Sequence, residues 1–274
     1  MRVLVTGATG NVGRHLVAQL HEAGHEVRAL TRNPANAGLP AGVEAVAGNL
    51  IDTGTLEDAF RSVDAIHLIT FGGGGYDDLT NGPEIVALAE RSGIRRATVL
   101  GGWSPTGIES ALTSSKLVWT ILQPKEFMGN ALEWANEIHA ANTVSMLATF
   151  RSAVVHEADI ASVAVCALTE DGHGGRSYVL TGPEALTPEE RTRILAKATG
   201  RDITFVKLTE DGERERLRGY GYDDDYVEFG IQLATKPPAE AGVVLPTVEI
   251  VTGRRARTFA LWAQENVEQF LSVR

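Results

Sequence analysis

The residues with the clearest chemical signature lie near the start of the sequence, in Thr6-Gly7-Ala8-Thr9-Gly10-Asn11-Val12-Gly13. Gly7 allows a tight turn at the end of a strand, and Gly10 lets backbone amides approach a diphosphate closely. Gly13 permits close packing of a helix on the strand, and the positive end of that helix favours phosphate. Glycines also serve ordinary turns. The apolar strand before the motif and the helical spacing after it favour a dinucleotide site over a purely structural turn.

The end of the second expected strand bears on the choice between NADH and NADPH. A site for NADH places a carboxylate there, which accepts hydrogen bonds from the adenosine ribose. This chain has Leu30-Thr31-Arg32-Asn33-Pro34 instead. A guanidinium can stack on adenine and pair with a 2′-phosphate through two parallel hydrogen bonds. Arg32 therefore predicts NADPH, and the alternative is a solvated arginine at the start of a loop.

Two further loops follow expected strands, at the strand ends where open α/β sheets bind ligands. Gly48-Asn49-Leu50 follows the third strand, and Asn49 is a candidate partner for the adenine edge. Thr70-Phe71-Gly72 follows the fourth strand, and the glycines at 72–75 leave room beside a cofactor. A surface loop without a function is the alternative for that glycine run.

Alternating strands and helices over the first half of the chain predict the scaffold for these loops. Continuous apolar strands separated by amphipathic helices indicate a parallel sheet covered on both faces. The prediction is an α/β, Rossmann-type doubly wound fold. The expected strands are Val3–Thr6, Glu26–Leu30, Val43–Ala47, Ala65–Ile69, Ala97–Leu100 and Val118–Leu122. The expected helices are Val12–Ala23, Thr55–Ser62, Glu84–Ser92 and Ile108–Ser115.

The rest of the chain is expected to extend this sheet and to add a small lobe. Residues 1–130 are predicted to form the NADP(H)-binding core. Residues 131–274 are predicted to return strands and helices to that core and to form a C-terminal substrate lobe, within one structural unit. Residues 210–241 are polar and give no assignment. The expected later elements are a helix at Ile160–Leu168, a strand at Ser177–Leu180, a helix at Pro188–Ala198, a strand at Arg201–Lys207 and a helix at Thr258–Leu271.

Composition narrows the class of protein. The 274 residues carry a net charge of −10, which argues against nucleic acid because its phosphates repel an acidic surface. Cys166 is the single cysteine, so the chain has no disulfide framework and fits a reducing cytosol. No metal-ligand spacing, leader pattern or apolar run of ~20 residues is found. We therefore expect a cytoplasmic protein with a small-molecule carbonyl partner, and leave a homo-oligomer open.

These motifs together resemble the NmrA-like branch of the atypical short-chain dehydrogenase/reductase superfamily. The similarity lies in TGATGNVG (Thr6–Gly13), TRNP (Thr31–Pro34), GNLID (Gly48–Asp52), LVWTILQPKEFMGN (Leu117–Asn130), HEADIASVA (His156–Ala164) and YVLTGPEALT (Tyr178–Thr187). The resemblance implies NADP(H) on the sheet and a variable C-terminal lobe. It also implies quinone, ketone or ether-like substrates or, in some members, cofactor sensing without catalysis. By the same resemblance, Pro124, Lys125 and Phe127 contact the nicotinamide. A solvated lysine is the alternative for Lys125.

The chain departs from this superfamily at the residues that usually carry catalysis. Its reductases use a serine after the fifth strand and a Tyr-x-x-x-Lys on the next helix, where the tyrosine donates a proton to the nascent alkoxide. Gly101 and Gly102 stand at the serine positions here, and no tyrosine occurs between Gly101 and Trp119. Lys116 is the only lysine in that stretch, and it lies too late to be taken as catalytic. Glu109 matches a glutamate that the family often keeps, and we expect it to have a structural role.

Other side chains are left as candidates for the chemistry and for substrate contact. The catalytic group is unknown, and Ser104 and Lys125 are the remaining candidates, although a serine before Pro105 also suits a turn. An aromatic substrate could stack on Trp103 and Phe127, for which wall packing is the alternative. The residues expected to contact substrate are Trp103, Ser104, Phe127 and Met128.

Three tyrosines, Tyr220, Tyr222 and Tyr226, flank the acidic run Asp223-Asp224-Asp225. We interpret the run as a solvated loop. A lid that carries a tyrosine over the cofactor is the alternative.

The resemblance favours an oxidoreductase that uses NADPH to reduce a ketone or quinone carbonyl. Some antibiotic-pathway ketoreductases, including that of the simocyclinone pathway, resemble this group and also lack the serine and tyrosine. An aromatic, polyketide-type substrate is therefore the leading prediction, and a non-catalytic NADP(H)-sensing regulator is the alternative. The residues expected to bind NADPH are Gly7, Thr9, Gly10, Asn11, Val12, Gly13, Arg32, Asn33, Asn49, Leu50, Thr70, Phe71, Gly101, Gly102, Pro124, Lys125 and Phe127.

Overall fold

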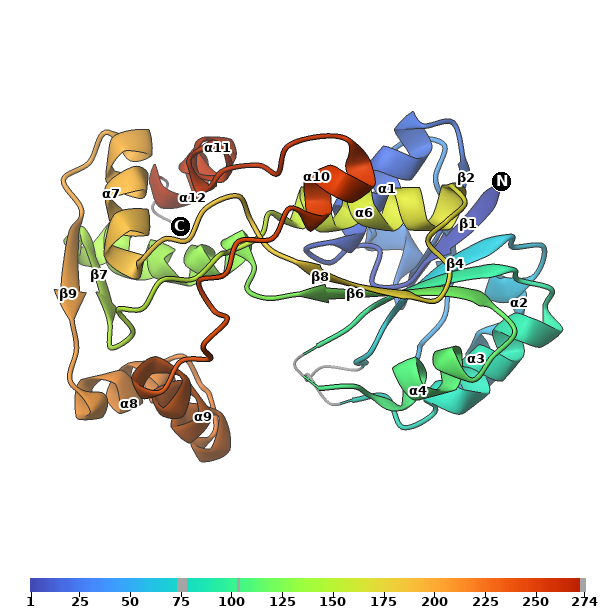
Figure 1. The fold of residues 1–274 in the computed structure, drawn as a ribbon, viewed down its shortest axis with the longest axis horizontal. Coiled ribbons are helices and arrows are strands. Elements are labelled where there is room, and N and C mark those ends of the chain that lie inside the picture. Colours follow the sequence, from blue (N-terminus) through green and yellow to red (C-terminus); the bar gives the residue numbers. More distant parts are fainter. Residues whose placement is uncertain (73–77, 103, 272–274) are drawn as a thin grey trace. The chain divides into compact units, whose positions relative to one another are not determined.

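The structure is a computed structural model that describes residues 1–72, 78–102 and 104–271 (Figure 1). The chain divides into two compact units. The first, here called the sheet unit, comprises Met1–Pro124, Glu157–Leu180 and Thr247–Arg254. The second unit comprises Lys125–His156, Thr181–Pro246 and Arg255–Arg274. Two later segments therefore join the sheet unit, and the predicted assignment of cofactor and substrate functions to residues 1–130 and 131–274 stays a prediction.

The sheet unit is built on a seven-stranded parallel sheet of the order β3-β2-β1-β4-β5-β6-β8 among the described residues. The chain winds outward from β1 to β3 and then returns to the other side of β1 with β4. The strand order thus reverses between β1 and β4, which is where ligands bind in such sheets. The strands are β1 (Arg2–Val5), β2 (Glu26–Thr31), β3 (Glu44–Ala47), β4 (Ala65–Ile69), β5 (Arg96–Leu100), β6 (Val118–Pro124) and β8 (Arg176–Leu180).

Helices cover both faces of this sheet, so the predicted doubly wound α/β fold is confirmed. The helices of the sheet unit are α1 (Gly13–Glu22), α2 (Glu57–Phe60), α3 (Gly82–Arg91), α4 (Gly107–Thr113), α6 (Glu157–Thr169) and α10 (Thr247–Thr252). Helices α1, α6 and α10 lie on one face, and α2, α3 and α4 lie on the other (Figure 1). Such two-sided cover explains why the central strands are mostly apolar.

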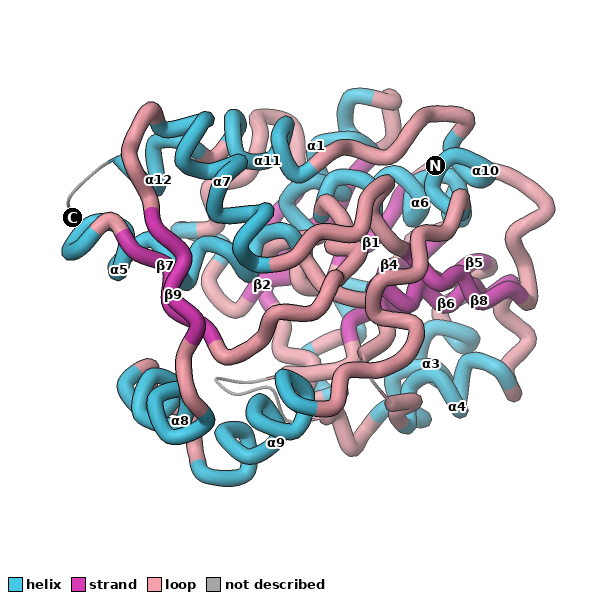
Figure 2. The backbone as a smooth tube through the Cα atoms, turned by 60° about the vertical axis from the view of Figure 1, so that its left-hand side comes forward, coloured by secondary structure: helices cyan, strands magenta, loops and turns pink. Residues whose placement is uncertain are grey.

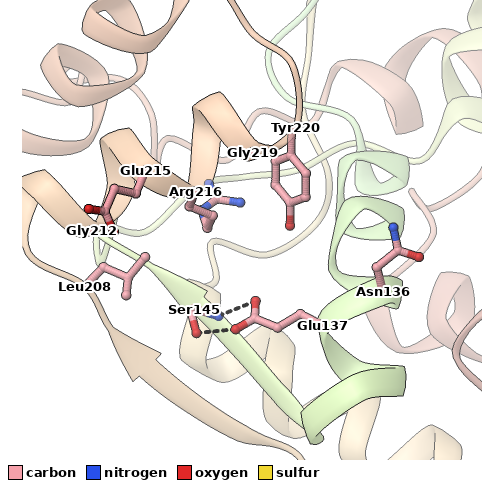
Figure 3. Close-up of a pocket in the computed structure, with 9 residues that line it drawn as sticks. All are labelled: Asn136, Glu137, Ser145, Leu208, Gly212, Glu215, Arg216, Gly219 and Tyr220. Atoms are coloured by element: carbon pink, nitrogen blue, oxygen red, sulfur yellow. Dashed lines mark hydrogen bonds between the residues drawn. The ribbon is translucent and has the colours of Figure 1, made fainter.

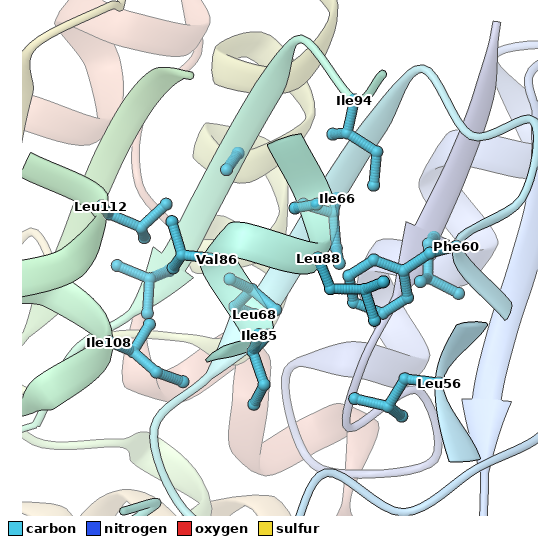
Figure 4. Packing of buried hydrophobic residues seen from close by; sticks show 14 of the residues in the cluster. Leu56, Phe60, Ile66, Leu68, Ile85, Val86, Leu88, Ile94, Ile108 and Leu112 are labelled. Carbon is cyan, nitrogen blue, oxygen red and sulfur yellow. The ribbon is translucent and has the colours of Figure 1, made fainter. Parts of the chain in front are cut away.

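A core of aliphatic and aromatic side chains fills the space between the sheet and the helices α2 to α4 (Figure 4). Ile66 and Leu68 on β4 point into it, and Phe60, Ile85 and Ile108 meet them from the helices. All five side chains have no exposed surface. Burying a side chain of this size contributes about 1.5–3 kcal/mol, so this cluster fixes the sheet that carries the strand-end loops.

The second unit is mainly helical. Its elements are a 3-10 helix at Met128–Trp134, α5 (Ala135–Ala141), β7 (Thr143–Met146), α7 (Pro188–Thr199), β9 (Thr204–Lys207), α8 (Glu210–Gly219), α9 (Asp224–Thr235), α11 (Phe259–Glu265) and α12 (Val267–Leu271). Strands β7 and β9 form a separate parallel pair, and α8 lies beside α9 (Figure 2). Trp134, Phe259, Trp262 and Phe270 are buried in its core.

The predictions for the later chain need several corrections. The sequence predicts no helix or strand in residues 210–241, but the structure has α8 and α9 there. Both helices bury few residues, and ion pairs such as Arg214 with Glu228 cover their surfaces. That polarity hid their helical period. The strand expected at Arg201–Lys207 starts only at Thr204 and pairs with β7 outside the main sheet. The terminal helix expected at Thr258–Leu271 is interrupted at Asn266, so α11 and α12 are separate.

The sequence predicts a solvated loop at the acidic run Asp223–Asp225. This prediction is wrong, because the run forms the start of α9. Asp223 is the residue that caps the helix, and its carboxylate accepts a hydrogen bond from the backbone N–H of Tyr226 at 2.8 Å. Asp224 and Asp225 occupy the first turn. Carboxylates are favoured there because the helix dipole is positive at that end. None of the described helices is long and apolar enough to cross a membrane.

Candidate dinucleotide-binding site

The glycine turn joins β1 to α1 at the point where the strand order reverses. Gly7 has a φ of +60°, which side-chain-bearing residues rarely adopt, and the N–H of Gly10 donates to the Gly7 oxygen at 2.9 Å. A Cβ at Gly13 would collide with the Gly7 oxygen and lie 2.7 Å from the Gly7 carbonyl carbon. Because these are backbone atoms, only glycine fits at position 13. The first turn of α1 therefore packs directly on the end of β1.

The amino-terminal end of α1 is suited to an anion. No side chain caps this end, and no acidic residue occupies the first turn. Thr9, Gly10 and Asn11, which lead into the helix, are exposed. N–H groups in a first helical turn have no partner within the helix, and with the helix dipole they attract phosphate. A cradle that a Cβ would fill, next to an uncapped helix end, fits the diphosphate of a dinucleotide.

Thr6 fixes the end of β1 to the end of β4. The side chain is fully buried, its hydroxyl accepts a hydrogen bond from the N–H of Ile69 at 3.0 Å, and its N–H donates to the His67 oxygen at 3.0 Å. The two strands on either side of the reversal are thus locked together just before the glycine turn. A rigid strand pair holds the loops that follow Thr6 and Ile69 in fixed positions.

Arg32 lies one strand away from the glycine turn, at the same carboxyl edge of the sheet. Strand β2 ends at Thr31, and both Arg32 and Asn33 are exposed. The N–H of Asn33 donates to the Thr31 hydroxyl at 3.3 Å, which turns the chain away from the strand. No carboxylate occurs between residues 30 and 34. This placement fits a 2′-phosphate better than a free pair of ribose hydroxyls.

Asn49 and Leu50, the two predicted cofactor residues in the loop after β3, differ in burial. Asn49 is half-buried, and its Oδ1 lies 3.4 Å from the N–H of Ile51, a long contact that orients the amide only weakly. Leu50 is buried in the core, and its carbonyl accepts a hydrogen bond from Asn81 at 2.8 Å. The Leu50 side chain therefore supports the loop from beneath. The backbone of Leu50 and the side chain of Asn49 stay predicted contacts for an adenine.

The loop after β4 begins with Thr70 and Phe71, beside the glycine turn in the order of strands. Thr70 is buried, and its carbonyl accepts from the N–H of Leu79 at 2.9 Å. Phe71 is half-buried and pairs with Asp78. The glycines at 73–75 of the predicted glycine run lie outside the described residues.

The turn after β5 is organised by Glu109 rather than by a serine. Glu109 is buried on α4, and its carboxylate accepts a hydrogen bond from the N–H of Thr106, which caps the helix. Its predicted structural role is confirmed. A Cβ at Gly101 would lie 2.5 Å from Glu109 Oε1, whereas a Cβ at Gly102 meets nothing within 4 Å. A serine side chain at position 101 has no room unless the glutamate moves.

The remaining sheet-unit candidates are less informative. Ser104 is exposed, just before the turn that starts α4, and Trp103 lies outside the described residues. Lys116 follows α4 in a turn, where its N–H donates to Glu90 at 2.7 Å, so it is not part of a catalytic helix.

His67, on β4, is fully buried, and burial lowers its pKa to about 4. A neutral imidazole with one nitrogen 2.8 Å from the Thr98 hydroxyl is a structural group here.

The residues after Pro124, which ends β6, belong to the second unit. Lys125 is a third exposed, with Nζ 3.9 Å from Glu240 Oε1. Phe127 is half-buried and pairs with Val155. Met128 is fully buried in the apolar core of the second unit and presents no surface to a ligand. Met128, predicted to contact substrate, is instead part of this core.

Glu126 was missed by the sequence analysis. Its carboxylate pairs with the buried Arg191 of α7 at 2.8 Å. One sequence signal was available: Arg191 stands four residues before the buried Leu195, on the inward side of an amphipathic helix. A charged residue on such a face needs a partner of opposite charge.

The tyrosines near the acidic run make contacts within the second unit. The Tyr222 hydroxyl donates to Glu133 Oε1 at 3.1 Å, and its ring stacks on Tyr226 with 4.2 Å between centroids. Burial, and then the Glu133 carboxylate, raise the pKa of Tyr222 above its usual value. A raised pKa makes the phenol a poorer proton donor. Its role as part of a lid stays a prediction.

A hollow of about 520 Å³ lies in the second unit, between α5, β7 and α8 (Figure 3). Ser145 donates to Glu137 from both its N–H and its hydroxyl, and Arg216 pairs with Glu213 at 2.6 Å. Ser145, Glu137 and Arg216 at its wall are thus already paired. No group of three or more His, Cys, Asp and Glu side chains in the described ranges is arranged to hold a metal ion.

Comparison with known proteins agrees with this geometry. A family model described as NAD(P)H-binding matches residues 7–104. The chain is 37% identical to a (4-alkanoyl-5-oxo-2,5-dihydrofuran-3-yl)methyl phosphate reductase of Streptomyces griseus, over 98% of this chain and 99% of that protein. It is 33% identical to an NAD(P)H azoreductase of Xenophilus azovorans, with the same coverage of both chains.

Solved structures share the fold at lower identity. The triphenylmethane reductase of Citrobacter sp. superposes with a TM-score of 0.79 and 21% identity, over 99% of both chains. NmrA, a negative transcriptional regulator solved with NADP, gives a TM-score of 0.73 and 17% identity over 96% of this chain and 94% of that chain. The sheet and its glycine turn define the class as a dinucleotide-binding α/β protein. With two end-to-end relatives above 30% identity, both of them reductases, the chain belongs to the family of NAD(P)H-binding reductases.

Proposed function

We propose that this protein is an NADPH-dependent reductase of a small, electron-poor conjugated molecule, with a quinone or an aromatic, polyketide-type ketone as the substrate. The observation that carries the proposal is the end-to-end similarity to two reductases, at 37% and 33% identity. A regulator that only senses the cofactor is the alternative suggested by the missing serine and tyrosine. It is less well supported, since the regulator NmrA is only 17% identical.

The substrates named for the relatives share one chemical feature. An alkanoyl-oxo-dihydrofuran holds a carbon–carbon double bond conjugated to carbonyls, and an azo compound holds a nitrogen–nitrogen double bond. Each accepts a hydride at one end of the double bond, and the charge is delocalised or protonated at the other. Quinones and aromatic ketones accept hydride in the same way. This common acceptor chemistry supports the proposed substrate class.

The cofactor side of the site follows from the sheet unit. The turn Gly7–Gly13 and the uncapped start of α1 would hold the diphosphate. Arg32 would bind the 2′-phosphate, and Asn33 and Asn49 would border the adenosine. Bound NADPH supplies the hydride. Thr70, Phe71, Gly101, Gly102 and Pro124 would border the cofactor toward the nicotinamide. The contacts of Lys125 and Phe127 with the cofactor stay predictions from the sequence.

The source of the proton explains how a site without the usual tyrosine can work. Reduction of a quinone or a conjugated acceptor places negative charge on an oxygen or a nitrogen that water can protonate. The main tasks of the protein are then to orient the two reacting atoms and to exclude excess water. The Ser104 hydroxyl and the Lys125 ammonium group are the candidates to stabilise the developing charge.

The test is steady-state oxidation of NADPH, followed at its near-ultraviolet absorbance band, with a panel of quinones, aromatic ketones, azo compounds and alkanoyl-furanones. We expect turnover with at least one class, and a higher kcat/KM with NADPH than with NADH. Tight NADPH binding with no turnover of any acceptor would favour the regulator. The acidic composition and single cysteine support a cytoplasmic enzyme, for which fractionation of cells that express the native chain is the corresponding test.

A further inference from the structure

Three aromatic side chains, Tyr222, Tyr226 and Phe229, form what we call the aromatic stripe, on α9 and the turn before it. The Tyr222 and Tyr226 rings stack with 4.2 Å between centroids, and the Phe229 ring lies 6.3 Å beyond that of Tyr226. Tyr226 and Phe229 are 46% and 45% exposed. Among the described residues, every exposed Phe, Tyr or Trp lies within positions 220–229. Contiguous exposed rings, unlike single exposed apolar residues, indicate a binding surface.

Helix α9 is held by its other face, so the aromatic stripe has a firm support. Val227 and Ile231 are buried, one helical turn apart, on a different side of the helix from the stripe. A Cβ at Gly230 would lie 2.9 Å from the Leu217 side chain, which shows how closely α9 packs on α8. The two helices lie side by side in Figure 2. The stripe is therefore presented outward from a packed helix pair.

The surroundings of the stripe are acidic. Residues 210–236 hold eight Asp and Glu against four Arg and Lys, so this short segment has a net charge of −4. The Tyr222 hydroxyl donates to Glu133 Oε1 at 3.1 Å, which places a carboxylate at one end of the stripe. Asp225 is exposed and stands four residues before Phe229, a spacing that puts both on the same side of α9. A positive charge over the stripe would meet carboxylates nearby.

The guanidinium groups of α8 do not offset this acidity. The helix carries three arginines, each paired with a carboxylate: Arg214 with Glu228 at 2.8 Å, Arg216 with Glu213 at 2.6 Å and Arg218 with Asp224 at 2.9 Å. Arg216 also lies over the Tyr220 ring at 5.2 Å, so one tyrosine of this segment already faces a cation. An anionic ligand would find no unpaired arginine on α8 and would be repelled by the carboxylates.

We propose that the aromatic stripe, bordered by Glu133 and Asp225, is a binding site for a flat aromatic molecule that carries a positive charge. The rings supply stacking area, and the negative faces of the rings together with the carboxylates favour a cation over an anion. A phosphate ester is disfavoured at this surface for the same reason. The site is built from contacts within the second unit, and it does not require the protein to be a reductase.

Three matched probes separate stacking from charge. N-methylacridinium, acridine and acridine-9-carboxylate share one flat ring system and are cationic, neutral and anionic in mildly alkaline buffer. Fluorescence titration of each probe with the full chain, without cofactor, gives its Kd. We expect N-methylacridinium to bind about tenfold more tightly than acridine, and acridine-9-carboxylate to bind most weakly. Molar salt should reduce the advantage of the cation.

Variants separate the stripe from the general acidity of the chain. Tyr226→Leu with Phe229→Leu removes two rings but keeps apolar, helix-favouring residues, and should bind N-methylacridinium about tenfold more weakly at a near wild-type melting temperature. Asp225→Asn should weaken the cation about threefold and leave acridine unchanged. The matched control is Glu189→Gln in α7, which removes the same charge from a side chain that is 57% exposed and pairs with Arg193 at 3.3 Å. It should bind all three probes like the wild type.

Equal affinity of the wild type for the three probes would overturn the proposal, as would wild-type binding by the folded double-leucine variant. Sedimentation velocity adds a third contradicting outcome. A wild-type dimer that the double-leucine variant converts to monomers would show that a second copy of the chain covers the stripe. All of these measurements are made without NADPH, so they stay decisive even if the protein reduces none of the acceptors in the panel.

Discussion

Two turns of the sheet unit contain a glycine that the packing requires, and they require it for different reasons. At Gly13, a Cβ would strike the backbone of Gly7 and Ala8. At Gly101, a Cβ would strike the carboxylate of Glu109 and would lie 3.3 Å from the backbone oxygen of Leu122, a tight but milder contact. Backbone packed against backbone cannot yield without shifting α1 from β1, but a side chain can move. Gly13 is therefore required by the packing of α1 on β1, whereas Gly101 is required only while the Glu109 carboxylate keeps its position.

The difference gives a physical reason why position 101 holds no serine, although a Cβ at position 102 would meet nothing within 4 Å. Glu109 caps α4 and fills the space in which a side chain at position 101 would lie. A side chain at position 101 and the capping contact of Glu109 therefore compete for the same space. An enzyme with such a turn must obtain its rate from orientation and from the reactivity of its acceptor, which agrees with a conjugated substrate.

The largest effect is expected for Gly13→Ala, because the added methyl group collides with backbone. We expect a loss of stability of about 3 kcal/mol or more, together with loss of NADPH binding. Thermal unfolding and fluorescence titration with NADPH measure the two effects. The matched control is Gly219→Ala in α8, where a Cβ meets nothing within 4 Å, and it should leave NADPH binding unchanged. Normal binding by Gly13→Ala would show that the turn does not hold the cofactor as described.

Strand β4, which lies between β1 and β5 in the sheet, should make the free energy of unfolding depend on pH. His67 on β4 is fully buried, with a pKa lowered by burial from 6.5 to about 4. Between those two pH values the unfolded chain binds a proton that the folded chain excludes, so stability falls as pH falls through that window. The expected loss from this group is about 3 kcal/mol at most. Denaturant unfolding at pH 7 and near pH 4 measures it.

The variant His67→Asn should flatten that dependence, because an amide can keep the contact with Thr98 without titrating. A wild-type protein whose stability does not change over this window would contradict the assignment of a neutral, buried imidazole.

A smaller effect is expected for Gly101→Ser, because the colliding group is a side chain. We expect a loss of about 2 kcal/mol, as is usual for overpacking. In combination with Glu109→Ala the loss from the serine should shrink, so that the two substitutions are not additive. Full additivity in a double-mutant cycle would show that Glu109 is not what excludes a side chain at position 101. No gain in activity is expected, since the tyrosine partner is absent as well.

The smallest effect is expected for Arg32→Ala, which concerns an exposed side chain. A charge-assisted pair with the 2′-phosphate predicts about tenfold weaker NADPH binding. NADH lacks that phosphate and serves as the internal control. Isothermal titration with both cofactors checks this, and equal losses for both would remove Arg32 as the residue that selects NADPH.

The sequence predicted the parts of this molecule that repeat a short local pattern. The glycine turn, the strands β1 to β6 and the return of β8 to the sheet follow from hydrophobic period and glycine spacing. It could not predict α8 and α9, because exposed ion pairs rather than apolar residues define their surfaces. Contacts between distant segments were also out of reach. Nothing local indicates that Glu126 meets Arg191, or that Glu109 takes the space above Gly101.

Transient kinetics with NADPH deuterated on either face of C4 tests the central claim most directly, since that claim is hydride transfer to a conjugated acceptor. With a quinone or azo acceptor identified in the panel, we predict a saturable single-turnover oxidation that is slowed by deuterium on one face and not on the other. NADPH that binds tightly yet is oxidised by none of the acceptors would contradict the account and leave a cofactor-binding protein without chemistry.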